Sequence, residues 1–203
     1  MIPCRNEARS IGPLLDALAL QTLQPTEILI VDDQSTDESV AVVVQWQRAH
    51  PGGHAVRVVP GPGRGPGPAM NAGIAAITAD VIVRLDAHCV PDADYLEQSM
   101  RVLAASNVGI AGGAWRVRAG AETPVARAIA RVVSHPMGSG GARYRHPEAP
   151  GPQSMSVETV PFGTFRRPLW EQLGGFDESL SANQDFDFNY RARVAGYDVV
   201  LDR

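Results

Sequence analysis

Polar residues that could bind a cation or move a proton gather at four places, each directly after an apolar run. The third place carries Asp86-Ala87-His88. Side chains two residues apart in an extended segment point the same way, so Asp86 and His88 could bind one cation together. Carboxylate oxygen and imidazole nitrogen are both suitable ligands for a divalent metal ion. The four clusters occupy residues 3–7, 31–37, 84–88 and 183–187.

Each cluster also has a structural interpretation. Asp32, Asp33 and Asp37 could cap a helix, since a helix N-terminus favours acidic side chains. Asp185 and Asp187 could likewise be first-turn acids of another helix. A single histidine near the end of a strand is usually structural as well. Capping preferences do not, however, predict the order and separation of all four clusters, and that order favours a functional site.

Apolar periodicity predicts the elements that would position these clusters. Leucine and isoleucine repeat with helical spacing from Ile11 to Leu18, after Ser10, a residue type that caps helices. The alternation of strands and helices predicts an α/β fold with a mostly parallel central sheet flanked by helices. Ligands bind such sheets at the carboxyl ends of the strands, which is where the clusters lie. Further helices are expected at 40–50, 69–77 and 94–105, and strands at 27–31, 54–59, 81–85 and 197–201.

The composition is that of a globular protein with one substantial core. The chain has 203 residues, of which 44% are hydrophobic and 20% charged, which is ordinary for a globular domain. A net charge of −4 gives no reason to expect a nucleic-acid partner, whose phosphates would require a basic stripe. Cys4 and Cys89 form no C-x-x-C pair, which predicts free thiols and a cytoplasmic location.

Two stretches rich in glycine and proline interrupt the pattern. Residues 60–68 superficially resemble a phosphate-binding glycine loop, but their prolines lack the backbone N–H donors that such a loop needs. A dinucleotide-binding fingerprint is therefore set aside. Residues 136–152 are expected to form a loop or a disordered segment.

Both ends of the chain look abbreviated. Met1 and Ile2 are followed directly by Pro3, so little remains of the apolar run expected for a first strand. The strand expected at 197–201 is followed by only two residues, and nothing is expected to pack over it. We therefore expect a domain that is truncated at both ends.

Taken together, the clusters resemble those of glycosyltransferase family 2, which has the nucleotide-diphospho-sugar transferase fold called GT-A. The resemblance runs from Ile2 to Leu201 and is greatest to bacterial transferases of the succinoglycan type, which build exopolysaccharides. In these, Asp-Ala-His replaces the commoner Asp-x-Asp, and Phe-Gly-Thr-Phe-Arg-Arg precedes Gly-Gly-Phe-Asp-Glu. This sequence has the same segments at 86–88, 162–167 and 174–178. The ordered set is much more specific than any single motif.

The resemblance implies a single catalytic domain over residues 1–203, with a nucleotide-binding half at 1–105 and an acceptor and catalytic-base half at 106–203. It implies inverting transfer of a sugar from a nucleotide-diphospho-sugar, normally a UDP-sugar, to a saccharide or lipid-linked acceptor. A divalent cation, Mn²⁺ or Mg²⁺, would be required. A full-length protein could associate with the cytoplasmic face of a membrane through a missing C-terminal region.

On the donor side, the resemblance implies that Pro3, Arg5 and Glu7 line the nucleotide pocket and that Asp33 hydrogen-bonds the base. Arg5 stands where the family usually has an aromatic residue that stacks on the base. A guanidinium plane can also stack, so the same role is expected of Arg5.

On the reacting side, the resemblance implies that Asp86 lies beside the diphosphate and binds the metal ion with His88. Asp185 would be the catalytic base. Gln184 stands where the family usually has glutamate, and Asp187 stands where glutamate is common. These two departures leave the base in place and put recognition of the acceptor in doubt.

Two other functions are compatible with the same fold. A nucleotidyltransferase would need a glycine-rich loop with lysine or arginine after the first strand, and residues 3–7 offer none. A non-catalytic module that binds nucleotide sugar is favoured by Gln184 and by the abbreviated ends. Turnover of a nucleotide sugar would separate this module from an enzyme.

Overall fold

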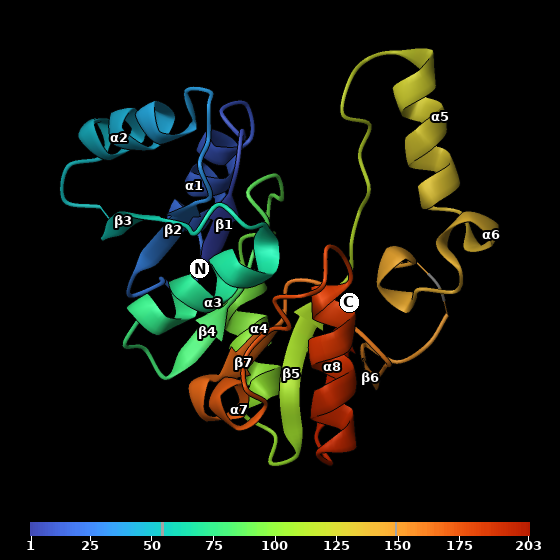
Figure 1. Cartoon of the computed structure of the whole chain (residues 1–203). Coiled ribbons are helices and arrows are strands. Elements are labelled where there is room, and N and C mark those ends of the chain that lie inside the picture. The colour runs from blue at the N-terminus through green and yellow to red at the C-terminus, as the bar shows by residue number, and fades with distance from the viewer. Residues whose placement is uncertain (54, 149) are drawn as a thin grey trace.

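The structure is a computed structural model that describes residues 1–53, 55–148 and 150–203 (Figure 1). Its helices flank two sheets, which confirms the predicted α/β class. His54, the first residue of one predicted strand, lies outside the described residues, as does Ala149 in the predicted loop at 136–152.

The smaller sheet is parallel, with the strand order β1-β2-β3. Helices α1 and α2 pack against each other, whereas α3 packs against β1 and β2. Ile11, Leu14, Leu15 and Leu18 of α1 are all buried, as their helical spacing predicted. The elements are β1 (Ile2–Cys4), α1 (Ile11–Ala19), β2 (Ile28–Asp32), α2 (Ser39–Ala49), β3 (Val56–Pro60) and α3 (Pro66–Ala76).

The larger sheet is mixed, with the order β4-β7-β5-β8-β6. Strands β5 and β8 are parallel, whereas β7 runs antiparallel to both β4 and β5, and β6 runs antiparallel to β8. The expectation that nothing packs over the last strand is wrong, because β8 lies buried between β5 and β6. The strands are β4 (Val81–Val83), β5 (Val108–Gly113), β6 (Ser154–Ser156), β7 (Thr164–Arg166) and β8 (Asp198–Asp202).

Met1 connects the two sheets. Its amino group donates a hydrogen bond to the Val83 carbonyl (2.8 Å), and its carbonyl accepts one from the Leu85 amide (3.1 Å). Bonding to residues on either side of Arg84 is the pattern of a parallel pair, so β1 and β4 run in the same direction. The carboxyl ends of β1, β2 and β4 therefore lie at one edge, and the first three polar clusters meet there.

The remaining helices fall into two groups. Helices α4, α7 and α8 cover the larger sheet, whereas α5 and α6 stand away from both sheets at one end of the molecule (Figure 1). The predicted loop at 136–152 is wrong in part, because it contains α6 and a 3₁₀ helix at Arg143–Arg145. The helices are α4 (Tyr95–Leu103), α5 (Pro124–Val133), α6 (Pro136–Ser139), α7 (Arg167–Gln172) and α8 (Gln184–Val194).

Ser10 and Asn183 occupy the N-cap positions of α1 and α8, but within the described chain neither side chain makes the capping hydrogen bond. Ser10 already has a helical backbone (φ −108°, ψ −32°), whereas a capping side chain normally needs an extended one. Asn183 has a left-handed backbone with φ 64°. The cap position of Ser10 was thus predicted correctly, and its capping bond was not.

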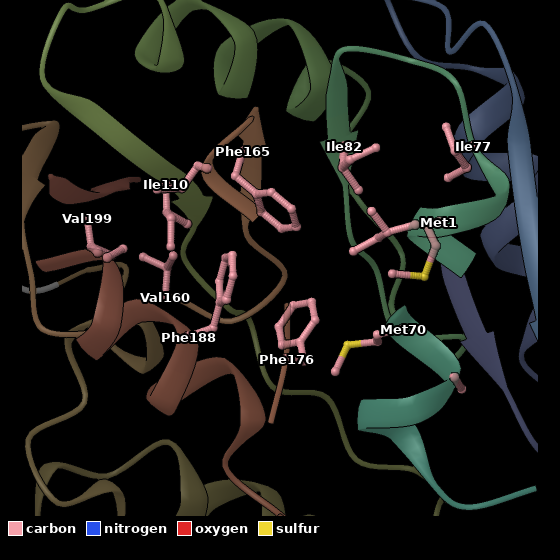
Figure 2. Packing of buried hydrophobic residues seen from close by; sticks show 14 of the residues in the cluster. Met1, Met70, Ile77, Ile82, Ile110, Val160, Phe165, Phe176, Phe188 and Val199 are labelled. Atoms are coloured by element: carbon pink, nitrogen blue, oxygen red, sulfur yellow. The ribbon is translucent and has the colours of Figure 1, made fainter. Parts of the chain in front are cut away.

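Three phenylalanines attach α8 to the larger sheet (Figure 2). Phe188 of α8 lies 5.0 Å from Phe165 of β7 and 4.6 Å from Phe176, measured between ring centroids. All three rings are at most 3% exposed. Aromatic pairs at these separations contribute about 0.5–1.5 kcal/mol each beyond the area that they bury. This cluster therefore fixes where α8 begins relative to the sheet.

In the 203-residue chain, the buried amino group of Met1 predicts a dependence of stability on pH. Burial lowers the pKa of this amine from 8.0 to about 5. Between those values the unfolded chain binds a proton that the folded chain does not, so stability should rise as the pH increases from 5 to 8. The full rise would be about 4 kcal/mol. Urea unfolding across this range measures it, with the Nα-acetylated chain, which cannot titrate there, as the control. An equal rise in both chains would contradict the assignment to Met1.

Candidate active site

The loops after β1 and β2 are held together by hydrogen bonds. The Asn6 amide donates to the Ser35 hydroxyl (3.0 Å), and the Asn6 side-chain oxygen accepts from the Thr36 amide (2.7 Å). The Glu7 amide donates to the Ser39 hydroxyl (2.7 Å). These contacts satisfy backbone donors at the start of both loops, so the first two polar clusters form one surface.

Asp33 is buried and organises the glycine and proline loop after β3. One carboxylate oxygen accepts a hydrogen bond from the Gly63 amide (2.6 Å) and the other from the Gly65 amide (2.9 Å). Gly65 has φ 96°, a conformation that favours glycine. At Gly61, a Cβ would come within 2.7 Å of the Asp33 carboxylate. The loop does direct two backbone amides at one group, as phosphate-binding loops do, but that group is the Asp33 side chain.

Arg84 brings the third and fourth clusters together. Its Nη2 lies 2.7 Å from Asp86 Oδ1, and its Nη1 lies 3.1 Å from Asp185 Oδ2. The arginine side chain is only 7% exposed and packs over the ring of Phe162, 5.3 Å from its centroid. A buried charge is stable only when it is paired, so Arg84 requires these carboxylates nearby. Arg84 belongs to the third cluster, but the sequence pattern predicted no role for it.

Asp185 lies in the first turn of α8, where the helix dipole should favour its ionised form. Burial nevertheless raises the pKa of Asp185 above its ordinary value; Arg84 lowers it, and the charge of Asp86 raises it further. Loss of hydration therefore outweighs the attraction of Arg84 at this site. The side chain is still 28% exposed, so a substrate can reach it.

Asp187 faces away from Asp185, as expected for helical residues two apart, which project about 200° from each other. Its Oδ2 accepts hydrogen bonds from Nε and Nη2 of Arg191 (2.9 and 2.7 Å). Arg191 also donates to the carbonyls of Leu173 and Gly175. Asp187 thus supports the loop before α8, and its predicted acceptor-side role stays a prediction.

The side chain of Gln184 also points into the protein interior. It is 7% exposed, and its side-chain amide donates to the Leu180 carbonyl (2.8 Å). This bond closes the turn that leads into α8. A role of Gln184 in acceptor recognition stays a prediction.

Asn71 of α3 holds the Gly-Gly-Phe-Asp-Glu loop from the opposite side. Its side chain donates to the Phe176 carbonyl (2.9 Å) and accepts from the Phe176 amide (2.8 Å). Gly175 has φ 79°, and a Cβ there would lie 2.8 Å from the Asn71 side-chain oxygen. Glycine is therefore required at this close approach. With Asn71 on one side and Arg191 on the other, the loop places Asp185 against Arg84.

Asp86 and His88 form the candidate metal pair. His88 Nε2 lies 3.8 Å from Asp86 Oδ2, and His88 Nδ1 lies 2.9 Å from Glu7 Oε1. Two metal–ligand bonds of about 2.1 Å can join atoms up to about 4.2 Å apart, so one cation fits between the pair. A carboxylate that accepts from the second histidine nitrogen is the usual support of a metal-binding imidazole, and Glu7 is placed to give it.

A cation at this pair would have two protein ligands. Among the residues that the structure describes, no three His, Cys, Asp or Glu side chains come together as a metal site. Magnesium usually binds one or two carboxylates and takes its other ligands from substrate phosphates and water. The pair therefore fits a cation that binds together with a phosphorylated substrate.

The other donor-side residues lie at the same edge. Arg5 is exposed in the loop after β1, and Pro3 is half-buried within that strand. Cys4 and Cys89 are free thiols, as predicted. Burial raises the pKa of Cys4 to about 11 and that of Cys89 to about 12, so both stay protonated at neutral pH. Burial thus disfavours the thiolate, the nucleophilic form, in both residues.

A cavity of about 350 Å³ lies at the opposite edge of the sheets, beside Met1, Ile28 and Val81. Its lining is mainly apolar, including Ile77, Ile82 and Leu96. A binding site for a polar ligand needs several convergent polar groups. Those groups lie at the other edge, around Asp86 and Asp185.

Comparison with known families gives one match over most of the chain. Residues 1–172 match the family model described as Glycosyl transferase family 2. The succinoglycan biosynthesis protein ExoA of Rhizobium meliloti is 28% identical over 207 residues, covering 98% of this chain and 58% of that protein. The pre-mycofactocin glycosyltransferase of Mycobacterium tuberculosis is 28% identical over 205 residues, covering 97% of this chain and 39% of that protein. The chain thus spans from 39% to 58% of the length of these two relatives.

Solved structures share the fold. The mannosyltransferase PcManGT of Pyrobaculum calidifontis, in complex with GDP-Man and Mn²⁺, superposes with a TM-score of 0.72 at 24% identity and covers 99% of this chain and 55% of its own. TarS of S. aureus in complex with UDP superposes with a TM-score of 0.71 at 17% identity, covering 99% of this chain and 56% of its own. These likenesses confirm the GT-A fold.

The burial of Arg84 predicts a large loss of stability when its charge is removed. Arg84→Met should lower the free energy of unfolding by about 3–5 kcal/mol, because Asp86 and Asp185 would lose their cation. Arg64→Met is the matched control. Its ion pair with Glu178 is exposed, so the loss should stay below about 1 kcal/mol. Urea unfolding at neutral pH measures the free energy of unfolding of both variants. Similar losses would show that the ion pairs of Arg84 stabilise the fold no more than an exposed ion pair does.

Proposed function

Because the chain belongs to glycosyl transferase family 2, we propose that it is the catalytic domain of a sugar-transferring enzyme. The donor would be a nucleotide-diphospho-sugar, with UDP as the nucleotide, and the product a polysaccharide or glycolipid. The observation that carries the proposal is that Asp86 and Asp185 meet at the buried Arg84. The names of relatives support it, since one takes part in succinoglycan biosynthesis and a structural neighbour was solved with UDP.

On the donor side, Pro3, Arg5, Glu7 and Asp33 would line the nucleotide pocket in the half at 1–105. Asp86 and His88 would hold Mn²⁺ or Mg²⁺, whose charge stabilises a diphosphate leaving group by several kcal/mol when bound. Support comes from the 3.8 Å between their facing atoms and from the Mn²⁺ in the complex of one structural neighbour. Glu7 would keep the imidazole of His88 turned toward Asp86.

On the acceptor side, in the half at 106–203, Asp185 would act as the general base. The acceptor oxygen attacks the anomeric carbon while the bond from that carbon to the diphosphate oxygen breaks. The bonding electrons go to the nucleoside diphosphate, and Asp185 takes the proton of the acceptor hydroxyl. A single displacement of this kind inverts the anomeric centre and needs no covalent enzyme intermediate.

Arg84 would keep the base in position throughout. Before transfer, its guanidinium pairs with Asp185 and so opposes the rise in pKa that burial causes. After Asp185 takes the proton, Arg84 is still paired with Asp86 at 2.7 Å. The buried cation is therefore never left without an anion, which lowers the cost of moving the proton.

The two alternative functions make different demands on the site. A nucleotidyltransferase would need free loop amides to bind a triphosphate, and the Gly63 and Gly65 amides are already bonded to Asp33. A non-catalytic binding module would bind UDP without transferring sugar. A screen of nucleotide sugars for turnover, with and without Mn²⁺ or Mg²⁺, separates that module from the enzyme.

The assignment of the base predicts different effects for the two acids of α8. In the intact protein, Asp185→Asn should retain UDP binding while transfer falls by at least about 100-fold, as expected when a general base is lost. Asp187→Asn is the matched control, because it lies two residues away and faces Arg191. Its main effect should be on stability. Transfer that survives Asp185→Asn but is abolished by Asp187→Asn would exchange the two roles.

The pH dependence of transfer follows from the same assignment. Only the ionised form of Asp185 can accept a proton, and burial raises the pKa of this carboxyl. The rate constant kcat/KM should therefore fall as the pH is lowered through that raised pKa, at a higher pH than for an exposed aspartate. Arg84→Lys keeps the positive charge but cannot span both carboxylates, so it should shift the profile less than Arg84→Met does. A profile that is flat down to pH 4 would remove Asp185 from the role.

Metal dependence is tested by binding alone. UDP titrated calorimetrically into the protein should bind at least about tenfold more tightly with Mn²⁺ than with chelator, and Asp86→Ala or His88→Ala should abolish this difference. Asp92→Ala, at an exposed acid outside the site, is the control. Equal affinity with metal and with chelator would remove the cation from the proposal.

A further inference from the structure

Helix α5 exposes an apolar face to solvent. Val125, Ile129 and Val132 have the helical spacing i, i+4 and i+7 and are 68%, 58% and 60% exposed. In a globular protein such a stripe normally packs against the core, as the corresponding stripe of α1 does. No residue of α5 is buried.

The placement of α5 explains why this face is uncovered. The helix stands at one end of the molecule, apart from both sheets, with the short helix α6 beside it (Figure 1). Met137 of α6 is 91% exposed and enlarges the apolar surface. Apolar side chains grouped in this way on helices that project from the fold indicate a surface that contacts a partner.

The charge around α5 differs from that of the rest of the chain. Residues 116–148 contain six arginines and two glutamates, whereas the other residues contain twelve arginines and twenty acids. Arg127 and Arg131 lie on the side of α5 away from the apolar stripe, because residues two apart on a helix project about 200° from each other. The helix therefore combines a small apolar face with a basic polar face.

This combination is typical of helices that lie in the interface of a membrane, with the apolar face among the acyl chains and the arginines near lipid phosphates. We propose that α5 docks on the surface of an anionic lipid bilayer, with Val125, Ile129 and Val132 inserted. The helix would lie on the bilayer, and no helix in the described part of the chain is long and apolar enough to cross a membrane.

The docking would place the bilayer beside the candidate active site. Strand β5 runs parallel to β4, since both pair antiparallel with β7, and its carboxyl end leads into the segment that carries α5. The helix therefore rises from the edge of the sheet that also carries Asp86. If the proposed function holds, a lipid-linked acceptor would meet the donor at this edge. The docking itself does not depend on that function.

Vesicle flotation of the 203-residue chain, without nucleotide or metal, tests the docking. The chain should float with vesicles made from equal parts of phosphatidylcholine and phosphatidylglycerol, and not with phosphatidylcholine alone. Binding should weaken when sodium chloride is raised to about 0.5 M, since salt screens the arginines. Equal flotation with both vesicles, or none with the anionic ones at low salt, would overturn the proposal.

Two pairs of variants test which surface binds. Val125→Asp/Ile129→Asp should reduce flotation at least about tenfold, whereas Val194→Asp, at a valine that is 70% exposed on α8, should not. Arg127→Glu/Arg131→Glu should reduce it similarly, whereas Arg48→Glu/Arg166→Glu, with the same change in net charge, should have much less effect. Equal losses in variants and controls would overturn the proposal. So would a dimer of the wild-type chain in light scattering that Val125→Asp/Ile129→Asp converts to a monomer, because a second copy would then cover the face.

Discussion

A buried guanidinium cannot be left unpaired, and the pairing of Arg84 connects the two halves of the chain. Arg84 follows β4, and its partners are a carboxylate two residues later and another about a hundred residues later, at the start of α8. The ion pairs of Arg84 therefore link the sheet edge that carries Asp86 to helix α8, which is distant in sequence and comes near only in the folded chain. The ring of Phe162 and the sulfur of Met70 enclose the same side chain, so little water can replace either carboxylate.

The start of α8 is fixed by interactions that leave Asp185 exposed to a substrate. Asn71 and Arg191 hold the loop before the helix, and the rings of Phe176 and Phe188 attach it to the sheet. The Oδ2 of Asp187 accepts two hydrogen bonds from Arg191. The two acids of this helix thus have separate tasks, one in holding the loop and one in facing the site. A rigid support of this kind keeps a reacting group within the small tolerance that catalysis requires.

Local sequence patterns predicted much of this arrangement. The apolar runs located β2, β4 and β8 to within about two residues, since near-continuous buried strands leave a clear signal. Strand β5 was missed because glycines fill half of its six positions, and β7 because only one of its three residues is apolar. The role of Arg84 was missed for a different reason. An arginine at the end of a strand gives no sign of its partner when that partner is distant in sequence. Asp33 was assigned to the nucleotide base, and its hydrogen bonds to Gly63 and Gly65 depend on a loop conformation that the sequence pattern did not reveal.

The unequal distribution of charge has a consequence for how the molecule moves. The segment that carries α5 is positive, and the remainder of the chain is negative, so their separation gives the protein a permanent electric dipole. In the field of a charged surface, a dipole experiences a torque before any contact is made. Near a negative surface that torque turns the end bearing α5 toward the surface. Rotational diffusion would then be biased within about one Debye length, roughly 8–10 Å in ordinary buffers, so that most first encounters involve the same face of the molecule.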